Sequence, residues 1–255
     1  MNELKEAITL VDIIALIVFF SCWVGYRYFA ELGKRGREGL VGITHEYRLQ
    51  WAMESTAREI PVACGSLTGN LMNSVSFYAS TTIYIIAGLF ALFGTIDQLE
   101  VLTVDMHLTD RVSRELIQLK LLLLIFIFIT AYFKFTWSLR QFNFLCILIG
   151  GTVYEKNMPN KEHWLKISKR MARINSQAGN EFNRGIRSYY YGIASLSWFI
   201  HPWLFIAATI WVTGLLYHRD FHSKALKILR DEYPPEYRDN YFFMKKEGDI
   251  KDHLK

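Results

Sequence analysis

Residues 121–133, with the sequence LLLLIFIFITAYF, form the stretch that decides the fold class of this chain. They carry no charge, and they extend an apolar segment that begins near Leu116. A helix rises about 1.5 Å per residue, so crossing a bilayer core of about 30 Å takes about 20 apolar residues. Helices of soluble proteins rarely stay this apolar, because one face must meet water. The stretch therefore predicts a membrane-spanning helix over about residues 116–139.

Three other segments of similar character flank this one along the chain, and they predict spans over about residues 9–29, 74–94 and 194–217. The chain is 51% hydrophobic, but the distribution decides more than the average, because the charges are gathered between the apolar runs. We expect a single membrane domain over residues 1–255. Its fold class is all-α: a four-helix transmembrane bundle with the lipid bilayer as its first partner.

The direction of the spans follows from the Lys and Arg residues beside them. The connection over residues 26–73 holds six basic residues, and residues 140–193 hold nine against three acids. Residues 95–119 hold only two basic residues against five acids. The first and third connections are therefore expected in the cytoplasm, with the second outside. This predicts a multi-pass protein of the cell inner membrane with both termini outside, on the periplasmic side.

The connections themselves contain apolar residues at helical spacing, over residues 38–59 and 161–174. We expect amphipathic helices there that lie in the cytoplasmic interface, or that pack on the protein's own loops. A second arrangement makes residues 145–151 a re-entrant piece, since seven apolar residues are too few to span.

The motif Phe-Asn-Arg-Gly-Ile-Arg at residues 182–187 precedes a run of tyrosines and the sequence Ser-Trp-Phe at residues 197–199. Together with Arg-Glu-Ile-Pro at residues 58–61 and Arg140, this pattern resembles the membrane proteins grouped as domain of unknown function 599, which occur in bacteria and plants. The resemblance covers nearly the whole chain. It implies a four-helix membrane fold and supplies no activity, cofactor or catalytic residue.

A stripe of small and polar residues runs along the second expected span. Its members recur at helical spacing: Asn70, Asn73, Ser80 and Tyr84. Unsatisfied polar groups are costly in lipid, so we expect the stripe to face protein or water. We interpret it as a surface for tight helix packing, with a pore or substrate path as the alternative.

Polar residues on the third span, Lys134 and Ser138, form a matching stripe that is a second candidate part of such a path. Arg140 follows it, and Arg58 and Arg187 lie at the same expected side of the membrane. These arginines are candidate contacts for an anion or a lipid headgroup, unless they serve only as ordinary cytoplasmic anchors.

Two further pairs are candidate interactions. Glu59 is the acid nearest to the second span, and we expect it to form an ion pair with Arg187, because a lone carboxylate near the bilayer needs a partner. His218 and His222 are four residues apart on one helical face, a spacing that suits a metal ion as well as an ordinary interfacial position.

No nucleotide-binding, metalloprotease or serine-hydrolase motif occurs in the sequence, and we expect no cofactor and no nucleic-acid partner. The pattern favours a structural or accessory membrane component that assembles as a homo-oligomer or within a larger membrane complex. The alternative is an oligomeric channel or transporter whose second span lines the path. An enzyme is the least supported class.

Overall fold

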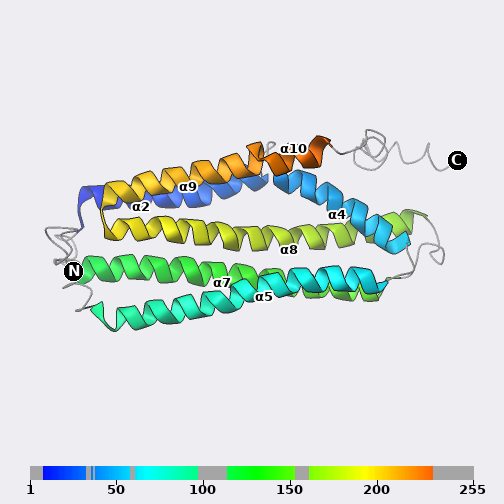
Figure 1. Cartoon of the computed structure of the whole chain (residues 1–255), viewed down its shortest axis with the longest axis horizontal. Coiled ribbons are helices and arrows are strands. Elements are labelled where there is room, and N and C mark those ends of the chain that lie inside the picture. Colours follow the sequence, from blue (N-terminus) through cyan, green and yellow to red (C-terminus); the bar gives the residue numbers. More distant parts are fainter. Residues whose placement is uncertain are drawn as a thin grey trace.

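A computed structural model describes residues 8–32, 36, 38–57, 61–96, 114–152 and 161–231, and every element in these ranges is helical. The long helices run along one axis of the molecule (Figure 1). In chain order they are α2 (Leu10–Arg27), the π-helical turn η1 (Tyr28–Leu32), α4 (Leu40–Ala57), α5 (Pro61–Phe93), α7 (Arg114–Gly150), α8 (Lys161–Leu196), the 3-10 turn η3 (Ser197–Phe199), α9 (Pro202–His222) and α10 (Lys224–Asp231).

Among the described residues, three helical segments are long and apolar enough to cross a membrane: Leu10–Glu31, Cys64–Phe93 and Arg114–Gly150. They contain the first three expected spans. The helix α7 continues without interruption to Gly150, so residues 145–150 extend a long helix and form no re-entrant piece. The prediction of an all-α membrane-type fold is confirmed at this level.

The expected fourth span over residues 194–217 is wrong as a single helix. The helix α8 ends at Leu196, the turn η3 follows, and α9 begins at Pro202 with His201 as its N-cap. The imidazole Nδ1 of His201 accepts a hydrogen bond from the amide of Trp203 at 3.2 Å. Proline favours the first turn of a helix and disfavours the interior, so Pro202 starts a new helix here.

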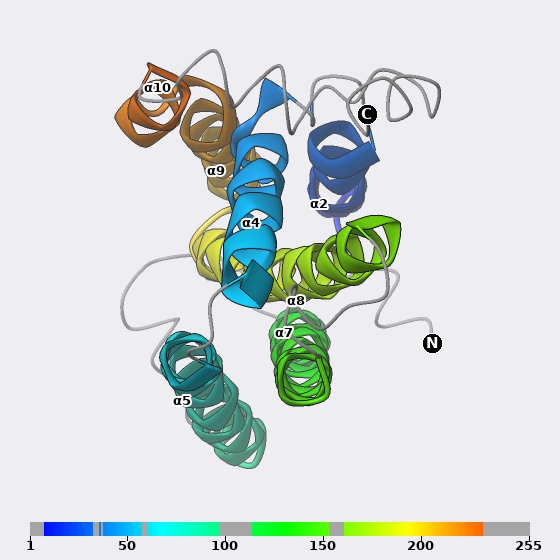
Figure 2. The same ribbon diagram turned by 90° about the vertical axis from the view of Figure 1, so that its right-hand side faces the viewer.

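The expected amphipathic helix over residues 161–174 is the first part of α8, which has 36 residues and runs beside α7. The end-on view in Figure 2 places α8 in the middle of the molecule, with α7 and α5 on one side and α2, α4 and α9 on the other. The polar first half of α8 and its tyrosine-rich second half thus belong to one central helix.

The helix α9 runs parallel to α2. Asp12 near the start of α2 contacts Trp198 just before α9, and Tyr26 near the end of α2 contacts Asp220 near the end of α9. The helix α8 is antiparallel to both, since Tyr191 contacts Thr213 and Arg187 contacts Asp220. The start of α2 therefore lies at one end of the bundle, and the end of α9 lies near its mid-length (Figure 1).

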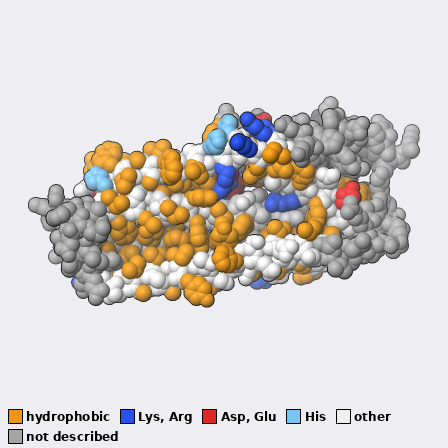
Figure 3. Space-filling view, viewed as in Figure 1, with side chains coloured by type: hydrophobic (Ala, Val, Ile, Leu, Met, Phe, Trp, Pro, Cys, Tyr) orange, Lys and Arg blue, Asp and Glu red, His pale blue; other side chains and the backbone are white. Residues whose placement is uncertain are grey.

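A band without charged residues crosses these helices at a common level. Its edges are marked by the contacts of Asp12 and Lys120 with Trp198 at one level, and by the contacts of Arg187 with Glu31 and Asp220 at the other. Between these levels the uncharged stretches are residues 13–26 of α2, 121–133 of α7, 188–200 of α8 and η3, and 202–217 of α9. At about 1.5 Å per residue, each covers about 20–24 Å. Figure 3 shows the same division: hydrophobic side chains gather over one end, and the Lys and Arg side chains lie from mid-length onward.

Beyond the band, α4 packs against the first half of α8 through a polar interface. The indole Nε1 of Trp164 donates to Thr56 Oγ1 at 2.7 Å, and His45 Nδ1 lies 2.7 Å from Ser176 Oγ. Burial, followed by the positive charges of Arg48 and Arg173, lowers the pKa of His45. These contacts show that α4 packs on another helix of the same chain.

Close packing of α7 against α8 depends on a glycine. A Cβ atom at Gly185 would clash with the ring of Phe135. The ring of Phe135 is fully buried and is held between Tyr78, Phe182 and Tyr189 at centroid distances of 5.6–5.7 Å. It has no room to retreat, so only glycine permits this approach of the two helices.

We predict that Gly185→Ala destabilises the protein by about 1–3 kcal/mol, the usual cost of overpacking. Gly214→Ala is the matched control, because a Cβ atom there meets nothing within 4 Å. Alanine is the better helix former, so the control is expected to be neutral or to gain up to about 1 kcal/mol. Thermal melting of the purified variants in detergent measures both. Equal melting temperatures would show that the α7–α8 contact tolerates a methyl group.

Candidate functional site

The site is built on one face of α8, where Glu181, Arg184 and Arg187 follow one another three residues apart. Residues at this spacing lie side by side on a helix. At this level α8 passes between α2, α7 and α9, so its charged side chains meet charges from three other segments.

Arg187 is the centre of the network. Its Nη1 donates to Glu31 Oε1 at 2.9 Å, and its Nη2 donates to Asp220 Oδ2 at 2.9 Å. The side chains of all three residues are 6–7% exposed. The hydroxyl of Tyr26 donates to the same Asp220 oxygen at 2.8 Å, and the guanidinium Cζ lies 5.3 Å from the ring centroid of Tyr26. Arg187 thus joins α8 to η1 and α9.

Arg184 and Lys134 extend the network toward α7. Arg184 Nε donates to Glu31 Oε2 at 2.8 Å, and its Nη1 pairs with Glu181. Lys134 Nζ lies 3.0 Å from Glu181 Oε2. Two buried or half-buried carboxylates therefore bridge three cations, an arrangement that offsets part of the cost of removing each ion from water.

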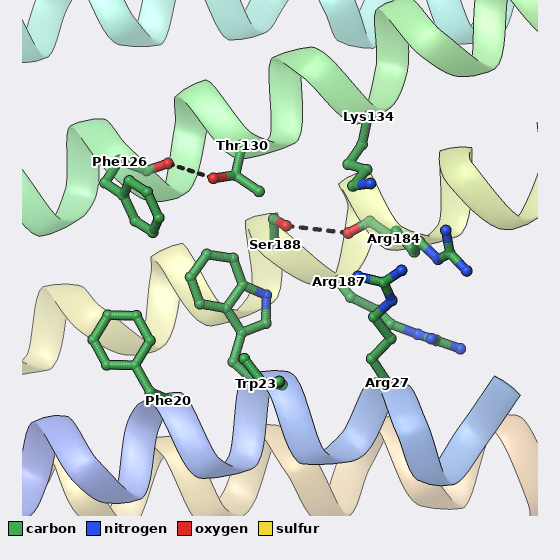
Figure 4. Close-up of a pocket in the computed structure, with 10 residues that line it drawn as sticks. Phe20, Trp23, Arg27, Phe126, Thr130, Lys134, Arg184, Arg187 and Ser188 are labelled. Atoms are coloured by element: carbon green, nitrogen blue, oxygen red, sulfur yellow. Dashed lines mark hydrogen bonds between the residues drawn. The ribbon is translucent and has the colours of Figure 1, made fainter. Parts of the chain in front are cut away.

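A cavity of about 290 Å³ opens beside this network, between α2, α7 and α8. Its apolar side is lined by Phe20, Trp23 and Val24 of α2 and by Phe126 of α7. Its other end is lined by four basic side chains, those of Arg27, Lys134, Arg184 and Arg187. Figure 4 shows the aromatic rings at one end of the space and the four basic side chains at the other, with Lys134 and Arg27 pointing toward each other from α7 and α2.

The predicted stripe on α5 lies away from this network. Asn70, Asn73, Ser80 and Tyr84 are all exposed, and Tyr84 is 77% exposed. The opposite face of α5 packs on α7 through Val75, Ala79 and Leu89. Within the described residues, the stripe faces neither another helix nor an enclosed cavity.

The polar residues of α7 face α8 instead, so the two expected stripes do not meet. Ser138 is buried, and its hydroxyl donates to the carbonyl of Ala178 at 2.7 Å. Lys134 faces Glu181 and the cavity. Arg140 is exposed, with its Cζ 5.8 Å from the ring centroid of Phe144, and it does not line the cavity.

The remaining candidates gain less support. His218 and His222 stack with ring centroids 6.0 Å apart at the end of α9, and no group of three metal-ligating side chains exists among the described residues. Arg58 and Glu59 lie outside the described residues, so the expected pair of Glu59 with Arg187 stays a prediction. The described partners of Arg187 are Glu31 and Asp220.

Comparison with known proteins gives one match. The model of a family described as protein of unknown function, DUF599, matches residues 14–225. The chain belongs to this family. No curated protein and no solved structure matches the chain. The predicted resemblance is therefore confirmed.

In this DUF599 protein, sequence reasoning singled out Arg187 and Lys134 but missed their partners Glu31, Glu181 and Asp220. Two signals were present. Glu31 follows the first span by a few residues, and Asp220 follows the last uncharged run in the same way. An acid next to the basic end of a span indicates an ion pair, because a lone carboxylate close to the bilayer is costly.

We predict that Arg187→Gln destabilises this DUF599 protein by about 3–5 kcal/mol, because it leaves Glu31 and Asp220 as buried charges without their shared partner. Arg140→Gln, which changes an exposed arginine of α7, is expected to stay within about 0.5 kcal/mol of the parent. Melting in detergent compares the two variants. The double variant Arg187→Gln, Glu31→Gln is expected to lose less than the sum of its single changes. Strict additivity would contradict the pairing.

Proposed function

We propose that this chain is a multi-pass protein of the cell inner membrane that assembles with copies of itself as a structural or accessory component. The observation that carries the proposal is the exposure of polar side chains on α5 within the uncharged band. The assembly surface is the outer face of α5, defined by Ser80, Tyr84 and Gly88.

The level of these residues follows from the packing of α5 on α7. The ring of Tyr78 lies 5.6 Å from that of Phe135, next to Lys134 at one edge of the band. Leu89 clusters with Leu121 and Leu124, near the other edge. Tyr84 lies between these contacts, in the middle of the band. Asn70 and Asn73 lie beyond its edge, since Met72 contacts Cys146 at 3.8 Å.

A tyrosine hydroxyl in the middle of a bilayer needs a partner. Leaving a hydroxyl without a hydrogen bond in an apolar medium costs about 2–7 kcal/mol, depending on the reference state. Tyrosine prefers the membrane interface, where its hydroxyl meets water. Tyr84 and Ser80 have no hydrogen-bond partner among the described residues, so a second copy of α5 offers both burial and acceptors.

Small residues beside these hydroxyls favour a helix as the covering element. A Cβ atom added at Gly88 meets nothing within 4 Å, and the same is true at Gly65 and Gly69. Small residues at an exposed helix face let a second backbone approach closely, which favours pairing of helices in membranes. Beyond the band, Asn70 and Asn73 continue the same face.

The alternative function is an oligomeric channel or transporter in which the same face of α5 surrounds a central path. The exposed hydroxyls and amides along α5 favour it, because a polar stripe suits water as well as a second helix. Several copies around an axis would be needed for a path, whereas a pair suffices for packing.

For the membrane path, we propose five crossings in place of four. Besides α2, α5, α7 and α9, the second half of α8 crosses the band, from Arg187 to η3. With the acidic connection outside, the start of α2 is outside and the end of α9 is in the cytoplasm. In this path the basic residues after Tyr217 lie on the cytoplasmic side, where membrane proteins usually carry an excess of Lys and Arg. The first half of α8, α4 and the adjoining ends of α5 and α7 then extend into the cytoplasm.

We predict that Tyr84→Cys and Ser80→Cys give disulfide-linked dimers when membranes are oxidised. Trp211→Cys is the matched control, because Trp211 is 70% exposed at the middle of α9, against 77% for Tyr84 on α5. The parent, with Cys22, Cys64 and Cys146, provides the background. Gel electrophoresis without reductant measures the dimers. Equal yields from α5 and α9 would contradict the assembly surface, and solute flux lost on Ser80→Leu with the dimer retained would favour the channel.

The path with five crossings also predicts which residues a reagent can label from outside the cell. A cysteine at Gln98 is expected to react with a membrane-impermeant maleimide in intact cells, whereas one at Lys224 is expected to react only after permeabilisation. The reason is that α9 carries the chain back to the cytoplasmic side. The parent shows the labelling of the native cysteines. Reaction of Lys224→Cys in intact cells would restore the path with both termini outside.

A further inference from the structure

We propose that the cavity between α2, α7 and α8 binds one anionic amphiphile, with a phosphodiester headgroup at its basic end and a hydrocarbon chain along its aromatic side. The proposal concerns a different surface from the outer face of α5, because the lining helices are α2, α7 and α8. It can therefore hold whether or not the chain self-assembles.

The cavity is divided into two chemical halves along the axis of the bundle. Phe20, Trp23 and Phe126 form a continuous aromatic group, since the ring of Trp23 lies 6.1 Å from Phe20 and 6.2 Å from Phe126. These rings lie within the uncharged band, where a hydrocarbon chain is the natural neighbour. The basic half begins at Arg27 and Lys134, the first cations at the edge of the band.

Donors remain available at the basic end. Arg27 is exposed and has no ion-pair partner among the residues that the structure describes. The Nε donor of Arg187 is buried without a hydrogen-bond partner, although this residue is only 5% exposed. That donor is closed to solvent, so the exposed guanidinium of Arg27 offers the accessible donors.

The charge balance favours an anionic headgroup. Four cations line the cavity, and the carboxylates of Glu31, Glu181 and Asp220 pair with three of them, Lys134, Arg184 and Arg187. Asp220 also pairs with Arg219, which does not line the cavity. The cluster therefore keeps a net positive charge, which favours a negative charge on the ligand. A phosphodiester carries one such charge, and Arg and Lys side chains are its usual partners in proteins. A zwitterionic lipid would bring a second, positive group to a site that is already basic.

The position of the cavity agrees with this ligand. It spans the level at which the uncharged band gives way to charged residues, where the headgroups of a bilayer lie. Basic pockets between membrane helices on the cytoplasmic side are recurrent sites for anionic headgroups. Figure 4 shows that the aromatic and basic ends are contiguous, so one molecule can occupy both.

The test is a titration of the delipidated full-length protein, followed by native mass spectrometry. The probes are dioleoyl phosphatidylglycerol, dioleoyl phosphatidylcholine and inorganic phosphate. We expect one phosphatidylglycerol per protomer, bound about tenfold more tightly than phosphatidylcholine, which corresponds to about 1.4 kcal/mol. Arg27→Gln is expected to remove this preference, and Val24→Trp is expected to weaken both lipids alike by filling the apolar half.

Two matched controls separate binding from general effects. Arg140→Gln removes an exposed arginine outside the cavity, and Ile17→Trp enlarges an exposed apolar residue of α2 that does not line it. Both are expected to bind phosphatidylglycerol as the parent does. The melting temperature of each variant without lipid shows that it is folded.

Two results would overturn the proposal. The first is binding of phosphatidylglycerol that stays as tight in Arg27→Gln and in Val24→Trp as in the parent, with the same preference over phosphatidylcholine. The second is displacement of phosphatidylglycerol by millimolar inorganic phosphate, with binding of phosphate lost in Arg27→Gln and kept in Val24→Trp. That pattern would assign the basic end to a free anion.

Discussion

The guanidinium of Arg187 lies between the carboxylates of Glu31 and Asp220, and the placement of the helices at this level depends on that bridge. The three side chains come from α8, η1 and α9. Their burial means that each needs the other two, since an isolated ion in a medium of low polarity is strongly unfavourable. The same requirement fixes the rotation of α8, which in turn directs Arg184 toward Glu31 and Glu181, and Gly185 toward Phe135.

The bridge also explains how a helix with a polar first half comes to lie at the centre of the molecule. Its last three charged residues, Glu181, Arg184 and Arg187, are paired. The residues that follow, to the end of η3, carry no charge. At the far side of the band, Trp198 donates to Asp12 at 2.8 Å, and Lys120 Nζ lies 5.5 Å from the same indole ring. Ionic contacts at two levels thus hold the same helices in register, with only apolar and hydroxyl side chains between them. The proposed lipid site lies where the inner level opens toward α2 and α7.

The residues of α5 show a different use of polar side chains. On α8 polar groups are paired inside the molecule, whereas Ser80 and Tyr84 present theirs outward. A helix that packs on its neighbours along one face, with small and hydroxyl residues on the other, fits an element at the boundary between subunits. The buried ion pairs of α8 stabilise the single chain. The exposed polar face of α5 is the surface that we propose joins one chain to another.

The sequence by itself determined the fold class, the family and the three most apolar helices, because long uncharged runs such as residues 121–133 report directly on burial away from water. It also pointed to Arg187 and Lys134 as unusual charges, and to the polar face of α5. Only the tertiary structure decided that residues 185–200 form a further segment that packs beside the apolar parts of α2, α7 and α9. Hydropathy averaged along α8 conceals this segment, because its short apolar run follows a long charged one. Pro202 then starts the next helix. The partners Glu31, Glu181 and Asp220 were hidden for the same physical reason: a charge is tolerated at this depth only with its counter-ion, and segments far apart in the chain supply the counter-ions.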